Sequence, residues 1–143
     1  MNNAEKAALR LIARAEQCSA GLLRKLEKRG IPAACAAEVV SRLTETGLID
    51  DARFARLWLQ SRLRLTRTPR RLLAGLYNRG IPRDEAQTAL DNVLDEETEL
   101  IMLVRFAKKH AKKADKFFLK SEGFSGHIID AYFSQSPQNC VEV

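Results

Sequence analysis

The chain has 143 residues, of which 45% are hydrophobic and 29% are charged, and its formal net charge is +6. This ordinary composition excludes a largely disordered chain, a collagen-like fibre and a disulfide scaffold. The longest apolar runs fall far short of the roughly 20 residues that a membrane-spanning helix needs, and the N-terminus lacks a signal-peptide pattern, so we expect a cytoplasmic protein.

The first 50 residues predict three helices. A leading helix covers Ala4 to Ala15, and a second begins at Cys18-Ser19, where a hydroxyl can cap the first turn. Residues 29–32 read Arg-Gly-Ile-Pro. This predicts a turn, because glycine suits the left-handed end of one helix and proline suits the start of the next. In the third helix, apolar residues recur at spacings of three and four, which is typical of one buried face.

An internal repeat is visible when the chain is shifted by 50 residues. Residues 22–36 and 72–86 then share eight of fifteen positions, including an unbroken Arg-Gly-Ile-Pro. A duplicated unit explains this identity better than coincidence does. The second copy predicts a leading helix from Asp51 to about Leu65 and another helix that begins at Thr68-Pro69.

A weaker third copy lies 43 residues further on, where Glu122-Gly123 replaces Arg79-Gly80, and its leading helix is expected from Glu97 to about Ala114. Units of this size cannot bury an apolar face alone, so stacked neighbours should share a nearly continuous core. The sequence therefore predicts an all-α tandem array of three three-helix repeats with an elongated or curved shape. The expected units are residues 1–50, 51–95 and 96–134, followed by a disordered tail at 135–143.

Charge is arranged in blocks along the chain. Residues 52–83 carry nine basic side chains, all arginine, and no acid, whereas residues 84–99 carry seven acids and no base. A lysine-rich stretch follows from Arg105 to Lys120. Such blocks indicate either a polyanionic or acidic partner, or a solvated surface on which the blocks neutralise one another.

The arginine block favours a binding partner. If the leading helix of the second unit continues through Arg67, four of its arginines fall within a sector of about 80° beside an apolar stripe. Arginine pairs with phosphate or carboxylate through two parallel hydrogen bonds, and cations at a helix start, such as Arg70 and Arg71, do not stabilise the helix. Solvation explains the lysine face of the third unit equally well. The candidate binding residues are Arg53, Arg56, Arg64, Arg67, Arg70, Arg71, Arg79, Arg83, Lys108, Lys109, Lys112 and Lys116.

The sequence shows no recognisable catalytic or metal-binding motif. Its two histidines match neither a zinc-ligand spacing nor a triad, and we expect His110 to pack at the edge of an apolar face. Cys35 is expected to be a small buried hydrophobe rather than a reactive thiol. Trp58 could stack on a nucleic-acid base, but packing beside Phe54 is the favoured interpretation. We therefore expect no enzyme activity, no cofactor and no metal.

Three stretches of the sequence match motifs of a known protein family. The most specific is GLIDDARFA at 47–55, and ALRLIAR at 8–14 is similar to the opening motif of that family. Pro69-Arg70-Arg71-Leu72, followed by Arg79-Gly80-Ile81, resembles the motif of its second repeat. On these motifs the chain resembles the RecX regulatory proteins, which are bacterial modulators of the RecA recombinase, and the resemblance spans about Ala7 to Phe133. The serine and acid that usually precede the first turn in the family are replaced by Cys18 and Gly21.

The resemblance implies a protein that lodges in the groove of a RecA–DNA filament. It further implies inhibition of strand exchange, ATP hydrolysis and co-protease activity, and hence a role in recombination, DNA repair and the SOS response. We expect a monomer, and single- or double-stranded DNA is left open as a further partner. Two alternatives remain: a sequence-non-specific DNA-binding protein that acts without a recombinase, and an unrecognised hydrolase, which the lack of a nucleophile–base pair disfavours.

Overall fold

The computed structural model describes residues 2–63 and 67–134, and within these ranges it contains helices and turns but no strand. The helices form three triplets in chain order. The first triplet comprises α1 (Asn3–Arg14), α2 (Ser19–Lys28) and α3 (Ala33–Glu45). The second comprises α4 (Asp51–Arg62), α5 (Pro69–Asn78) and α6 (Arg83–Val93). The third comprises α7 (Glu96–Lys109), α8 (Lys116–Ser121) and α9 (Gly126–Ser134).

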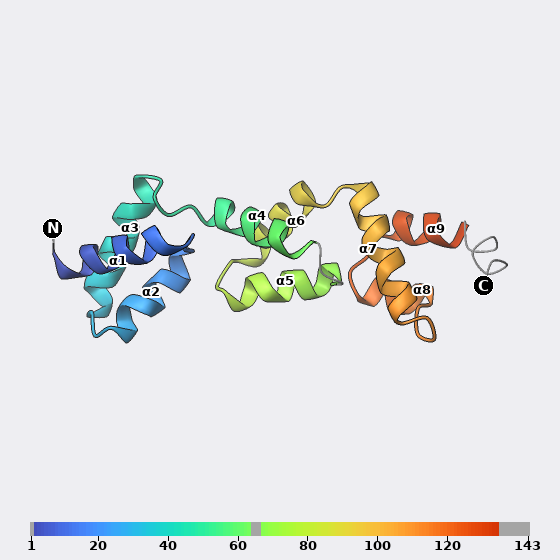
Figure 1. Ribbon diagram of the computed structural model, residues 1–143, viewed down its shortest axis with the longest axis horizontal. Helices are drawn as coiled ribbons and strands as arrows, with labels where there is room; N and C mark the ends of the chain where they lie inside the picture. The colour runs from blue at the N-terminus through green and yellow to red at the C-terminus, as the bar shows by residue number, and fades with distance from the viewer. Residues whose placement is uncertain (1, 64–66, 135–143) are drawn as a thin grey trace.

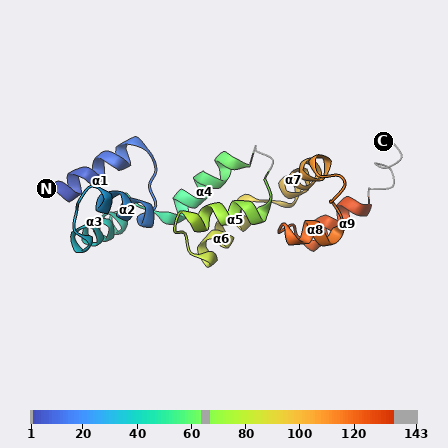
Figure 2. The ribbon, with the colours of Figure 1, turned by 90° about the horizontal axis from the view of Figure 1, so that it is seen from below.

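The three triplets follow one another along the long axis of the molecule, with the N-terminus at one end and α9 near the other (Figure 1). The same row of three is seen after a quarter turn (Figure 2). In the first and second triplets every helix contacts the other two, and in the third α9 packs against α7 and α8. The predicted all-α, elongated array of three-helix repeats is thereby confirmed.

Short polar side chains begin five of the helices. Each accepts a hydrogen bond from the backbone N–H three residues further on, which satisfies a donor that the first helical turn leaves unpaired. These caps are Asn2, Asp50, Thr68, Asp95 and Asp115. At α7, hydrogen bonds from Thr98 lower the pKa of the exposed Asp95 carboxyl, because they favour its charged form.

The same glycine turn joins the second and third helices of every triplet. Gly30, Gly80 and Gly123 have φ values of 88°, 89° and 95°, a left-handed conformation that glycine adopts without steric cost. The residue after each glycine donates its N–H to the carbonyl of a buried leucine, five residues earlier in the chain. This bond closes the end of the helix, so the repeated Arg-Gly-Ile-Pro predicted its turn correctly.

The hydrophobic core is divided unequally among the triplets. The first triplet has its own core, which includes Leu22 and Leu26, whereas the second and third share one that runs through Leu76 and Leu103. Each fully buried leucine contributes about 1.5–3 kcal/mol to stability. Of the described first-triplet residues, Cys18 alone belongs to the shared core. A continuous core was therefore predicted correctly between the second and third triplets and wrongly between the first and second, whose cores are separate clusters.

Several local predictions differ from the structure. Helix α4 ends at Arg62, so Arg67 lies in the loop before α5 and not on the helical face that the arginine stripe required. Helix α7 ends at Lys109 rather than near residue 114. Cys35 is exposed, because the buried face of α3 is made by other residues: Ala36, Val39, Val40 and Leu43. Arg64 and the tail at 135–143 lie outside the described residues.

Two remaining sequence features behave as ordinary structural elements. His110 is partly buried at the end of α7, with its ring 4.5 Å from that of Phe106, which confirms the predicted packing role. Within the described ranges, none of the helices has the length and apolar character needed to cross a membrane.

Candidate interaction surface

Arg53 links the first and second triplets through hydrogen bonds. Its Nε donates to Glu16 Oε1 at 2.7 Å, and its terminal nitrogens donate to the carbonyls of Gly47 and Leu48 at 3.2 and 3.1 Å. These two carbonyls follow the end of α3, where no further helical turn can satisfy them. The side chain is 34% exposed. A ligand of Arg53 would therefore have to compete with several internal acceptors.

Asp51 closes the same junction. Its carboxylate accepts hydrogen bonds from the backbone N–H and the hydroxyl of Ser19, at 2.7 and 2.6 Å. The first turn of α2 is thus capped from the next triplet, 32 residues later in the chain, and the prediction that the Cys18-Ser19 hydroxyl caps its own helix is wrong. The Cys18 thiol instead donates to the carbonyl of Arg79 at 3.3 Å.

Arg70 and Arg71 lie at the junction between the second and third triplets. Glu122, only 3% exposed, accepts hydrogen bonds from Arg70 Nε and Nη2 at 2.8 and 2.6 Å. Arg71 Nε lies 3.9 Å from the other carboxylate oxygen, and the Thr68 hydroxyl donates to that oxygen at 3.5 Å. A buried carboxylate needs such partners, because leaving it unpaired costs several kcal/mol. Both arginines therefore stabilise the array, although their side chains remain 60% and 58% exposed.

Trp58 packs against the shared core together with Phe54, which confirms the predicted packing role. The indole lies directly on α5: a Cβ added to Gly75 would come within 2.3 Å of the ring. Among the described residues, Trp58 Nε1 is buried without a hydrogen-bond partner. The close fit explains why the second repeat has glycine at 75, where the first repeat has Lys25.

Three arginines of the second triplet lie over aromatic rings. The guanidinium carbons of Arg62 and Arg79 are 4.5 and 4.9 Å from the centre of the Trp58 ring, and that of Arg83 is 5.1 Å from the Tyr77 ring. Such cation–π contacts contribute about 0.5–1 kcal/mol each at exposed sites. These side chains cover apolar surface in addition to carrying charge.

Six candidate cations remain among the described residues: one paired lysine and five exposed side chains without a partner. Lys116 Nζ is 3.8 Å from Asp130 and 5.7 Å from the centre of the Phe133 ring. The other five pair with no residue that the structure describes, and we call them the free cations. They are Arg56, Arg67, Lys108, Lys109 and Lys112. An acidic or phosphate-bearing partner can reach them without breaking an internal bond.

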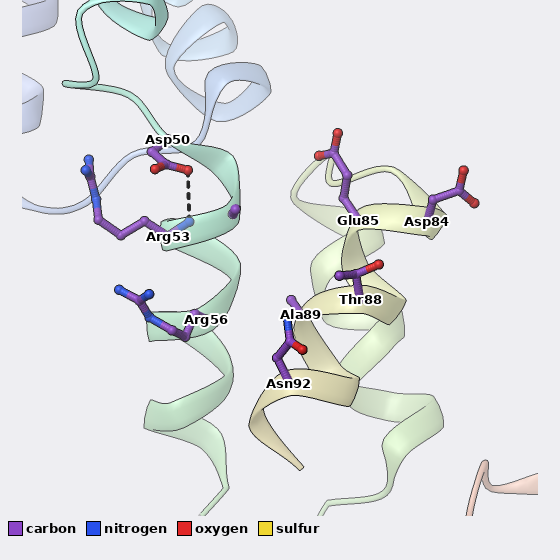
Figure 3. Close-up of a pocket in the computed structure, with 9 residues that line it drawn as sticks. Asp50, Arg53, Arg56, Asp84, Glu85, Thr88, Ala89 and Asn92 are labelled. Carbon is purple, nitrogen blue, oxygen red and sulfur yellow. Dashed lines mark hydrogen bonds between the residues drawn. The ribbon is translucent and has the colours of Figure 1, made fainter. Parts of the chain in front are cut away.

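A groove of about 420 Å³ lies between α4 and α6 in the second triplet. Arg53 and Arg56 line it from α4, whereas Asp84 and Glu85 line it from the first turn of α6 (Figure 3). In this view both arginine side chains extend away from α6. The α6 wall is acidic, whereas the α4 wall combines the two arginines with Asp50. No lining residue pairs a nucleophile with a base, so the groove offers a mixed polar surface without an evident reaction centre.

Reasoning from the sequence missed the acids that form ion pairs with the arginines. Glu16 and Glu122 are far from Arg53 and Arg70 in the chain, at separations of 37 and 52 residues. The repeat alignment contained a signal, because Glu122 stands at the position of Arg79 in the preceding unit. A charge reversal at a repeated position indicates a different local partner.

Comparisons with known proteins match most of the chain. A family model for "RecX, first three-helix domain" matches residues 4–43, and one for "RecX, second three-helix domain" matches residues 50–90. The chain is also 33% identical over 127 residues to Regulatory protein RecX of Treponema pallidum, which covers 88% of this chain and 72% of that protein. The chain belongs to the RecX family.

Other RecX proteins are similar over shorter stretches. The Thermobifida fusca protein is 38% identical over 100 residues, covering 68% of this chain and 54% of its own length. The Mycobacterium marinum protein is 42% identical over 83 residues, covering 57% and 48%, so the chain spans about half of these relatives. The crystal structure of RecX from Lactobacillus salivarius shares the fold, with a TM-score of 0.72 at 20% identity over 92% of this chain and 93% of that one. The curated RecX relatives are named regulatory proteins, which supports a regulator.

Proposed function

We propose that this RecX chain binds a filament of a RecA-type recombinase on DNA and lowers recombinase activity, with the free cations as its main contacts. One observation supports this placement above the others. Among the candidate binding residues, five exposed cations have no internal partner that the structure describes, whereas the neighbouring Arg53 and Arg70 pair with acids at the junctions between triplets. The free cations are therefore the part of the candidate surface that is available to an acidic side chain or a DNA phosphate.

The elongated array suits an extended partner better than a small ligand. A row of three triplets can contact several subunits of a polymer at once (Figure 1). A ligand that binds one arrangement of those subunits more tightly than another shifts the equilibrium toward that arrangement. In this proposal, the bound chain opposes the subunit movements that ATP hydrolysis and strand exchange require.

The test is inhibition of recombinase ATPase on single-stranded DNA by a variant with four free cations replaced by serine: Arg56, Arg67, Lys108 and Lys109. Each exposed ion pair contributes about 0.3–1 kcal/mol, so losing four should raise the concentration for half-inhibition about tenfold or more. The control removes the same number of arginines and lysines from exposed positions of the first triplet, namely Lys6, Arg10, Arg24 and Lys28. Equal inhibition by the two variants would contradict the placement.

Arg70 and Arg71 are unsuitable for this test. Both lie against the buried Glu122, so reversing their charge would weaken the junction between triplets as well as any external contact. The four-site variant avoids this difficulty, because its circular dichroism and unfolding transition should match those of the parent chain.

Bare DNA in place of the filament tests the alternative. A sequence-non-specific DNA-binding protein would bind bare single- or double-stranded DNA with an affinity that falls steeply with salt. If the chain binds bare DNA in this way but does not sediment with recombinase filaments, the alternative replaces the proposal.

A further inference from the structure

Both junctions between triplets follow one geometric rule: the second helix of one triplet rests on the glycine turn of the next. At the first junction, a Cβ added to Gly80 would lie only 2.5 Å from the Cβ of Ala20 in α2. At the second, a Cβ added to Gly123 would lie 2.9 Å from the backbone nitrogen of Arg70 in α5. That nitrogen donates to the Glu122 carbonyl at 2.9 Å. The absence of a glycine side chain is therefore what permits both contacts.

Among the described residues, the rule leaves one such surface without a neighbour at each end of the array. Around Gly30, the corresponding turn of the first triplet, no described atom lies within 4 Å of where its Cβ would stand. At the other end, α8 is the second helix of the third triplet, and no described glycine turn of a further triplet packs against it. Cys18 and Thr68, which precede α2 and α5, are 4% and 0% exposed, whereas Asp115, which precedes α8, is exposed. We call the Arg29–Gly30 turn the head surface and the exposed residues around Phe117 the tail surface.

The tail surface exposes a large apolar side chain, which is unfavourable on a surface that meets only water. Phe117 is 86% exposed. It is the second residue of α8, the register that Ala20 occupies in α2 and Arg70 in α5, and both of those residues contact the next triplet. An outer face of a repeat array that meets only water is normally polar. A phenylalanine in the one register that forms junctions indicates that this end makes a contact.

We propose that the tail surface of one chain docks on the head surface of a second copy, so that the contact repeats the two junctions inside the chain. Phe117 would then approach Gly30 of the second copy as Ala20 approaches Gly80. It would also lie beside the exposed Arg29, which stands at the repeat position of Arg79 and Glu122. A guanidinium over a phenylalanine ring is a favourable pairing. This inference is independent of the recombinase proposal.

The contact joins different surfaces of the two copies, so it does not close on itself. Head-to-tail contacts of this kind generate open chains. Because the surface involved is small, we expect a weak association, with a dissociation constant on the order of 0.1–1 mM. A dilute chain is then the monomer that the sequence predicted, and association appears only at high concentration.

The test is sedimentation equilibrium of the full chain from about 10 µM to 1 mM, with a reducing agent because Cys35 is exposed. Phe117→Lys disables the tail surface, since its lysine repels Arg29 of the next copy. Gly30→Ala disables the head surface, because its added methyl group meets only open space within one chain but would meet the docking helix of another. Each variant alone should associate at least tenfold more weakly than the parent chain.

Mixing the two variants gives the decisive result. Gly30→Ala keeps an intact tail surface and Phe117→Lys keeps an intact head surface, so an equimolar mixture should form dimers but no longer chains. A parent chain that remains monomeric at 1 mM, single variants that associate like the parent, or a mixture no more associated than its components would each overturn the proposal. If the parent stays monomeric while Phe117→Lys weakens filament binding, the tail surface binds the filament instead, and self-docking is wrong.

Discussion

The two junctions of the array share a backbone arrangement but differ in chemistry. At the first, the Arg53–Glu16 pair is about one-third exposed on both sides, and the cores of the two triplets are separate. At the second, Glu122 is buried and a single core continues from one triplet into the next. In a modular array, stability is the sum of unit and interface terms. We therefore expect the first junction to open more readily than the second.

The arginines of residues 52–83 also have different structural roles. Arg53 and Arg70 use their guanidinium groups to join triplets, and Arg62 and Arg79 cover Trp58. A block that looks uniform in the sequence thus supplies structural pairs at both junctions and leaves only part of its charge available. Each of the following variants weakens one junction selectively.

The largest effect is expected at the second junction, from Glu122→Ala. This change removes the shared acceptor of Arg70, Arg71 and Thr68 and leaves a cavity beside the core. Since the two guanidinium groups can regain water, we expect a loss of about 2–3 kcal/mol rather than the full cost of an unpaired buried charge. Urea denaturation measures the loss of stability, and hydrogen exchange in α8 and α9 locates it. The exposed Glu97→Ala is the control and should change stability by less than about 0.5 kcal/mol.

A matched pair of glycine variants isolates the close contact at the first junction. Gly30→Ala and Gly80→Ala impose the same left-handed strain, about 1 kcal/mol, because the two φ values differ by one degree. Only the methyl group at position 80 meets Ala20, so Gly80→Ala should cost about 1–2 kcal/mol more. Thermal unfolding measures both changes. Equal losses would show that the junction tolerates a side chain at this turn.

A smaller effect is expected from Asp51→Ala, which removes the cap of α2. Loss of a helix cap typically costs about 1 kcal/mol. The signature is its location: amide exchange should speed up at Ser19 and in the first turn of α2, although the substitution lies in α4. Asp50→Ala is the control, because it removes the cap of α4 itself and should leave exchange in α2 unchanged. The prediction is wrong if both variants affect only α4.

The smallest effect is expected for the Arg53–Glu16 pair. A double-mutant cycle with Arg53→Ala and Glu16→Ala should give a coupling energy below about 1 kcal/mol, because both side chains remain partly in water. The coupling should also shrink as salt is raised to 1 M. A coupling above about 2 kcal/mol would place the first junction on a par with the second and remove the distinction drawn between them.

The amino-acid sequence by itself determined the helices, the turns and the repeat. A glycine two residues before a proline, and apolar residues spaced three and four apart, act within one or two helical turns, so they predict local structure without knowledge of the tertiary packing. The helix ends were less accurate: α4 stops at Arg62, and nothing local in the predicted stripe of arginines marked that end.

Only the tertiary structure decided which cations remain available. Arg53, Arg70 and the Cys18 thiol find partners 37, 52 and 61 residues away. Those partners come together because each glycine turn lets the preceding triplet approach closely, and the resulting pairing depends on the stacking of whole triplets rather than on any neighbour in the chain. The charge blocks of the sequence indicated a binding surface, and the tertiary structure shows which of the candidate cations have no internal partner among the described residues.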